Sequence, residues 1–138
     1  MLELAAVGPR DVVYDLGCGD GRIVIEAAQR YGARGVCVDI DPQRIAEARA
    51  NAADAGVTDH ISFREEDVFQ TELRGATVVT LFLTLDMNLR LRPKLERELR
   101  PGARIVSHWH RMGDWRPERT ISVDEAGRSR QVFLWVKR

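Results

Sequence analysis

Three glycines at alternate positions follow an apolar run that ends in an acid, in the stretch VVYDLGCGDGR (12–22). A β-branched run leading into a glycine-rich turn and then a helix is typical of the first βα unit of a parallel sheet. Dinucleotide-binding loops space their glycines G-x-G-x-x-G. Here Gly17, Gly19 and Gly21 give G-x-G-x-G, with Asp15 two residues before them. The stretch therefore predicts an α/β fold but not a dinucleotide site.

Short β-branched runs alternate with longer helical stretches along the rest of the chain. The expected strands are 12–16, 35–40, 61–67, 76–83 and 103–109, and the expected helices are 21–31, 41–56 and one from Pro93 to residues 100–102. The tail, 120–138, predicts an antiparallel hairpin with its turn at 124–127. We therefore expect one domain, 1–138, with a Rossmann-like, doubly wound, mostly parallel seven-stranded sheet and a C-terminal antiparallel hairpin.

Composition and charge limit the classes of partner. The chain of 138 residues carries 21 Lys+Arg and 21 Asp+Glu, so its formal charge gives no electrostatic argument for nucleic acid or an anionic membrane. The longest apolar run, near 78–85, has the length of a strand, and residues 1–7 lack the basic start of a signal peptide. We expect a cytoplasmic monomer with no membrane partner. A bridge between Cys18 and Cys37 is conceivable, but reduced thiols are the expectation in that compartment.

Acidic side chains stand at the carboxyl ends of three successive predicted strands, Asp15, Asp39 and Asp67. Ligands of such sheets bind beyond this edge, beside the first strand. A carboxylate there repels a pyrophosphate but attracts a ligand that carries an amino group and a sulfonium, such as S-adenosylmethionine. Asp39 would then accept hydrogen bonds from the ribose hydroxyls and Asp67 from the adenine amino group. The alternative is that Asp39 and Asp67 are helix caps or turn residues.

With these motifs, the sequence resembles the class I, seven-β-strand methyltransferases. It is similar, more narrowly, to the small archaeal broad-specificity protein-lysine methyltransferases, whose mitochondrial relatives methylate ATP synthase subunit c and the adenine nucleotide translocase. The resemblance rests on VVYDLGCGDGRIVI, on ATVVTLFL with the following MNLRLRPKLERELRPGARIVSH, and on GDWRP. It implies S-adenosylmethionine as the cofactor and proteins that present a lysine as the substrates.

The resemblance also implies the residues of the site. The expected cofactor-binding residues are Asp15, Gly17, Cys18, Gly19, Asp20, Gly21, Asp39, Ile40, Asp67, Val68, Phe82 and Leu83. Thr84 is expected beside the reactive methyl, while Asp86 and His108 are candidates to take or relay a proton. Asp86 has the alternative role of a helix N-cap, and His108 that of a structural or substrate-orienting group. Relatives carry a segment before the first helix. Because this chain starts at MLELAAV, we expect either that the segment is absent or that the sequence is a shortened form.

Several other side chains leave alternatives open. Trp109 and Trp115 would form an aromatic wall at the substrate mouth, or at least one of them packs in the core. The run RLRPKLERELR predicts a solvated helix face with i,i+4 pairs such as Lys94 with Glu98, and nucleic-acid binding is the alternative.

His108 and His110 would share one face of a strand, but with no third ligand nearby we expect no metal site. Two functional alternatives also remain open. One is a methyltransferase of the same fold acting on a small molecule or a nucleic acid, against which the missing N-P-P-Y type loop after the fourth strand counts. The other is a non-catalytic module that binds S-adenosylmethionine.

Overall fold

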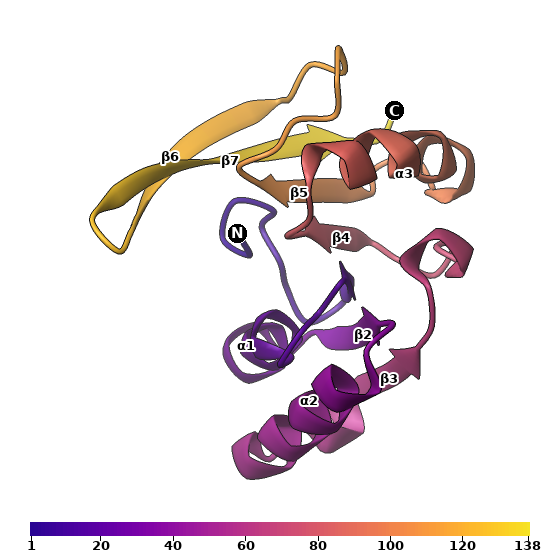
Figure 1. Ribbon diagram of the computed structural model, residues 1–138, viewed down its shortest axis with the longest axis vertical. Helices are drawn as coiled ribbons and strands as arrows, with labels where there is room; N and C mark the ends of the chain where they lie inside the picture. The colour runs from indigo at the N-terminus through magenta and orange to yellow at the C-terminus, as the bar shows by residue number, and fades with distance from the viewer.

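One seven-stranded sheet runs through the molecule in the order β3-β2-β1-β4-β5-β7-β6 (Figure 1). The computed structural model describes residues 1–138. The strands are β1 (Val12–Leu16), β2 (Arg34–Asp39), β3 (Ile61–Glu65), β4 (Val78–Leu81), β5 (Arg104–His108), β6 (Arg119–Glu125) and β7 (Arg128–Val136). Strands β1 to β5 pair in parallel, whereas β7 is antiparallel to both β5 and β6. The expected sheet with its terminal hairpin is confirmed.

The helices are α1 (Arg22–Tyr31), α2 (Pro42–Ala55) and α3 (Leu85–Glu98), with short 3-10 turns η1 (Thr58–His60) and η2 (Val68–Gln70). The ends of α2 follow from its capping residues. Asp41 accepts a hydrogen bond from the Gln43 N–H at 2.9 Å, Pro42 occupies the first turn, and Gly56 ends the helix at a φ of 73°. These bounds confirm the helix expected over 41–56.

The start of α3 differs from the prediction. The helix begins at Leu85, and the Thr84 hydroxyl caps it by accepting from the Met87 N–H, so Pro93 lies inside the helix and does not start it. The N-cap role considered for Asp86 is also wrong, because Asp86 lies in the first turn. A proline inside a helix removes one backbone hydrogen bond. Burial of Leu91 and Leu95, both fully inaccessible, offsets that loss.

The helices cover both faces of the sheet. Alternate residues of β1 show this, because Leu16 packs in the cluster that contains Leu91 and Leu95 of α3, whereas Val13 packs with Ala27 of α1. The segment at the N-terminus joins the second cluster through Leu2, Leu4, Ala5 and Val7. None of the helices combines the length and apolar character that crossing a bilayer requires.

The ion pair expected on α3 forms, but its surroundings differ from a solvated face. Lys94 Nζ lies 2.6 Å from Glu98 Oε2, and only 14% and 12% of the two side chains are exposed. Glu98 also accepts from the Leu73 N–H at 3.0 Å, which ties the segment before β4 to the helix. The carboxylate is therefore a structural acceptor, and these contacts lower its pKa below the usual value against the opposing effect of burial.

Candidate active site

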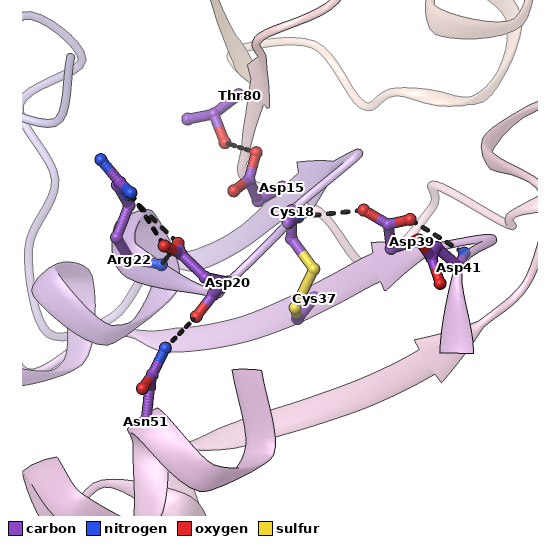
Figure 2. The surroundings of a disulfide bond; sticks show 10 residues. Asp15, Cys18, Asp20, Arg22, Cys37, Asp39, Asp41, Asn51 and Thr80 are labelled. Atoms are coloured by element: carbon purple, nitrogen blue, oxygen red, sulfur yellow. Dashed lines mark hydrogen bonds and ion pairs between the residues drawn. A yellow bond between two sulfur atoms is a disulfide. The ribbon is translucent and has the colours of Figure 1, made fainter. Parts of the chain in front are cut away.

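The loop after β1 is held against the end of β2 by its own backbone. The N–H groups of Gly17 and Cys18 both donate to the Val38 carbonyl, at 2.8 and 2.9 Å, and the Gly19 N–H donates to Asp39 Oδ2 at 3.0 Å. Figure 2 shows the carboxylate of Asp39 reaching the loop from the end of β2. Asn51 of α2 adds a further tie through its side-chain N–H to the Asp20 carbonyl, at 2.9 Å. The loop is thus fixed by contacts within the protein.

A disulfide joins Cys18 of this loop to Cys37 of β2 (Figure 2), so the expectation of reduced thiols is wrong for this structure. The turn of the loop onto β2 explains the bond. It brings the two Cα atoms to 5.3 Å, within the range that a disulfide requires. The two cysteines lie on neighbouring segments, as predicted, but their oxidation state follows from this short distance and not from the expected compartment.

All three glycines of the loop adopt the left-handed region, with φ of 79° at Gly17, 57° at Gly19 and 82° at Gly21. A Cβ on Gly17 would lie 2.8 Å from Leu83 Cδ2, and the positive φ would strain any other residue, so this close approach to the segment after β4 favours glycine. A Cβ on Gly19 would meet nothing within 4 Å. The surface beside Gly19 therefore has the open space that a closely bound ligand needs.

Asp15, at the carboxyl end of β1, is 2% exposed and accepts a hydrogen bond from the Thr80 hydroxyl at 2.9 Å. Burial is the main cause that raises its pKa from 3.8 to about 7, against the lowering effect of the Thr80 hydroxyl. Nearby Asp39 and Asp20 raise the pKa further. A carboxyl group in this environment is stabilised in its charged form by a cation, so its surroundings fit a positively charged ligand.

An open cavity of about 810 Å³ lies beyond the carboxyl ends of β1, β4 and β5. The glycine-rich loop and the first turn of α1 form one side, and the tip of the β6–β7 hairpin forms the other. The predicted site residues that line it are Asp15, Gly17, Cys18, Gly19, Asp20, Phe82 and His108. The volume lies in the usual range for small-molecule sites.

Other predicted cofactor-binding residues lie outside this cavity. Asp39 accepts from the Gly19 and Asp41 N–H groups, and Asp67 caps η2 by accepting from the Phe69 N–H at 2.9 Å. Ile40 is 69% exposed, Val68 is buried in the core, and Gly21 precedes α1 as its N-cap. Asp39 and Asp67 thus act as turn and cap residues, and their cofactor contacts stay predictions.

The three predicted catalytic residues separate in the structure. Thr84 caps α3 and Asp86 lies exposed in its first turn, and neither lines the cavity. Leu83, beside them, packs against the core. His108, the last residue of β5, does line the cavity.

Sequence reasoning missed the partners of His108. Its Nε2 atom lies 2.9 Å from Glu125 Oε2, and its ring stacks on Phe82 with centroids 4.1 Å apart. Glu125 closes β6 at the hairpin turn. The turn itself was recognisable in the sequence, but no spacing pattern connected it with the end of β5.

Comparison with known proteins decides the family. The model of the ANTKMT methyltransferase domain family matches residues 15–119. A protein-lysine N-methyltransferase from Saccharolobus islandicus is 45% identical over 137 residues, 99% of this chain and 85% of the relative. The chain belongs to this methyltransferase family. The expected resemblance to archaeal protein-lysine methyltransferases and their mitochondrial relatives is confirmed.

Two further similarities extend the comparison of the methyltransferase. The adenine nucleotide translocase lysine N-methyltransferase of Mus musculus is 36% identical over 104 residues, 75% of this chain but only 45% of the relative. The crystal structure of an RNA methyltransferase from Salinibacter ruber in complex with S-adenosyl-L-homocysteine superposes with a TM-score of 0.91. It is 50% identical in sequence and covers 98% of this chain and 86% of that one.

The two tryptophans expected at the substrate mouth of the methyltransferase have different surroundings. Trp115 packs against the core, and its carbonyl accepts from Trp135 Nε1 at 2.7 Å, which confirms core packing for one of the pair. Trp109 is 50% exposed, and the guanidinium of Arg130 lies 3.6 Å from its ring centroid. The chain leaves β5 at Trp109 with a φ of 69°, so His110 does not continue the strand on the face of His108.

Proposed function

We propose that the methyltransferase transfers methyl groups from S-adenosylmethionine to lysine side chains of proteins. The relatives from Saccharolobus islandicus and Mus musculus act on protein lysines, and the Salinibacter ruber structure contains S-adenosyl-L-homocysteine. The single observation in this structure that carries the proposal is the cavity itself. It places the buried acid Asp15 beside the open face of Gly19 and leaves a wide mouth toward the hairpin.

The residues present fit this cofactor. Bound S-adenosylmethionine supplies a methyl group on a positively charged sulfur. The lone pair of a neutral amine can attack the methyl carbon, and the sulfur then leaves as the neutral thioether of S-adenosyl-L-homocysteine. Asp15 would hold its cationic amino group, and the space beside Gly19 would admit the methionine backbone. Asp39 would bind the ribose hydroxyls and Asp67 the adenine amino group. Ile40 and Val68 directly follow these two acids in sequence.

Loop residues contribute to the proposed cofactor site mainly through their backbone. We assign Gly17 and Cys18 to holding the loop on Val38, and Asp20 and Gly21 to shaping its exit into α1. Phe82 and Leu83 follow β4 directly, so they would lie beside the transferred methyl. These assignments predict that the cofactor adopts its pose on a loop that is already ordered.

On the acceptor side, the protein mainly has to position an amine. Correct placement of two reacting groups supplies about 7–11 kcal/mol of a barrier, and a lysine with a reference pKa of about 10.4 must lose its proton first. His108 is the predicted catalytic residue that reaches the cavity. The Thr84 hydroxyl caps α3, and Asp86 lies away from the cavity. We therefore assign neither residue a direct role in proton transfer.

RNA is the second candidate acceptor, because the Salinibacter ruber protein is an RNA methyltransferase. The charge pattern of this chain favours protein instead. The mouth of the cavity carries Asp124 and Glu125, which would repel a phosphate backbone, and the formal net charge is zero.

Transfer of a labelled methyl group from S-adenosylmethionine into a methylation-poor lysate tests the proposal. The lysate is separated into protein, nucleic-acid and small-molecule fractions, and labelled protein is mapped by mass spectrometry. We expect label on lysine. Label in RNA would select the second candidate, and cofactor binding without any transfer would select a non-catalytic module. The cytoplasmic location and the monomeric state stay predictions, the latter testable by light scattering.

A further inference from the structure

The β6–β7 hairpin extends past the strand that supports it. Strand β7 pairs with β5 only from Val132, opposite His108, to Val136, so residues 128–131 continue beyond the carboxyl end of β5. Figure 1 shows this part of the hairpin projecting from the sheet on the side where the N-terminal segment lies. Residues 123–126 at its end line the cavity opposite the glycine-rich loop. The overhanging end of the hairpin therefore forms the wall of the cavity on the side where the methyl acceptor would enter, here called the acceptor side.

Glu125 stands on this wall in a defined position. Its Oε2 atom is 2.9 Å from His108 Nε2, and the His108 ring is itself stacked on Phe82. The side chain of His108 is 8% exposed, whereas that of Glu125 is 47% exposed. No protein group donates to Glu125 Oε1, so one carboxylate oxygen is held and the other is free to accept a hydrogen bond.

No arginine or lysine around the cavity forms an ion pair with Glu125. Asp20 is paired with Arg22, and Glu26 is paired with Arg30. Arg44, which also lines the cavity, is paired with Glu47. The carboxylates of Asp124 and Glu125 at the hairpin tip form no ion pair with an arginine or lysine, although Arg128 lies opposite Glu125 in the β6–β7 register. Acidic residues outnumber arginines along the lining of the cavity, so its mouth attracts a cation.

We propose that Glu125 binds the ammonium group of the acceptor lysine at the mouth of the cavity, and that His108 is the positioning residue that holds Glu125 there. This inference rests on the proposed lysine activity and names the group that recognises the substrate. Because an ionised carboxylate can only accept, Nε2 of His108 is the donor in this contact, and stacking on Phe82 orients the ring.

The position of Glu125 matches recognition better than proton abstraction. A carboxylate in contact with an amine favours the ammonium form, which cannot attack the methyl group. At the half-exposed tip, Glu125 meets the lysine as it enters. Loss of its charge is therefore expected to raise KM for the acceptor and to leave kcat nearly unchanged.

The test is a kinetic comparison of Glu125→Gln with the unaltered protein on a lysine-containing peptide. Glutamine keeps an oxygen that accepts from His108 but lacks the charge. A hydrogen bond to a charged group is worth about 1.5–3 kcal/mol, so we expect KM for the peptide to rise about 10-fold or more. The affinity for S-adenosylmethionine should stay the same. Glu72→Gln is the matched control, because Glu72 is exposed and does not line the cavity.

His108 is tested through its coupling to Glu125. His108→Phe keeps an aromatic ring for the stack on Phe82 but removes the donor, and we expect a several-fold rise in KM in the unaltered background. In the Glu125→Gln background the same change should add little, because a positioning residue acts through the group that it holds. Thermal unfolding of each variant checks that the fold is intact.

Each outcome is decisive. An unaltered protein that methylates the lysine peptide, with Glu125→Gln showing the same KM, overturns the role of Glu125 and leaves the proposed function standing. An equal rise in KM from His108→Phe in both backgrounds overturns the positioning role. If the unaltered protein transfers no methyl to lysine at all, the proposed function fails and this inference fails with it.

Discussion

The two sides of the cavity proposed to hold the methyl donor and the acceptor are held in different ways. On the donor side, the loop from Asp15 to Gly21 is tied to β2 by backbone hydrogen bonds, the Asp39 carboxylate and a disulfide. On the acceptor side, Phe82, His108 and Glu125 come from three separate segments and meet through one stacked pair and one side-chain contact. The donor side can therefore stay constant while the acceptor side changes. The variants below test that division.

The largest expected effect is the pH dependence that Asp15 imposes on stability. Burial raises its folded pKa to about 7 from 3.8, so between these values the folded protein binds more protons than the unfolded chain. Stability from this group is full below about pH 4 and is lost as pH rises through about 7. The whole loss is on the order of 4 kcal/mol. Urea unfolding from pH 4 to 8 should show this slope relative to Asp15→Asn, and parallel curves would contradict it.

Ionisation of Asp15 should strengthen cofactor binding as pH rises, whereas it weakens folding stability. A cationic ligand favours the ionised carboxylate, so affinity for S-adenosylmethionine is expected to rise as pH increases through about 7. Asp15→Asn should bind more weakly and without that dependence. Calorimetric titration at several pH values measures both.

The next largest expected effect is the loss of folding stability when the disulfide is removed. Cys18 and Cys37 are separated by 19 positions in sequence, and closing a loop of that length stabilises a protein by about 3 kcal/mol. Reduction, or the double change Cys18→Ser and Cys37→Ser, should lower the free energy of unfolding by that amount. The serine variant is its own control, because reductant should not affect it. Two titratable thiols in the untreated protein would refute the bond.

Asp39→Ala tests the donor side without touching the core. The change removes the acceptor for the Gly19 N–H and the proposed acceptor for the ribose. Because hydrogen bonds to charged groups are worth about 1.5–3 kcal/mol, affinity for S-adenosylmethionine should fall roughly 30-fold. Asp41→Ala is a matched control, since Asp41 caps α2 and should lower stability by about 1 kcal/mol without weakening the cofactor. Unchanged affinity in Asp39→Ala would exclude the ribose role.

The smallest effect is expected on the acceptor side, at Trp109. Its contact with Arg130 is exposed, and such a cation–π pair contributes about 0.5–1 kcal/mol. Trp109→Ala should therefore destabilise the protein by less than about 1 kcal/mol. Trp109→Gly should be close to neutral, because glycine relieves the positive φ of 69° at this position. A loss of several kcal/mol in either variant would mean that the acceptor side is as firmly held as the donor side.

The same division explains what the sequence could predict. The end of β1, the glycine-rich loop and the caps of α2 depend on residues a few positions apart, and all of them lie where the pattern indicated. The start of α3 was missed because Pro93 is a strong local signal, whereas the Thr84 cap is recognised only by its hydrogen bond. The contact of His108 with Glu125 spans 17 positions and depends on how far the hairpin overhangs β5.

The length of the overhang determines how far the hairpin tip lies from the end of β5. Each residue added to a strand lengthens it by about 3.3 Å, and successive side chains point to opposite faces. Adding two residues to both β6 and β7 would carry the tip about 7 Å outward with its carboxylate on the same face. Adding one would turn that carboxylate away. If the acceptor enters at the hairpin as proposed, hairpin length sets how deep a side chain must reach to be methylated, while the loop proposed to hold the cofactor stays as it is.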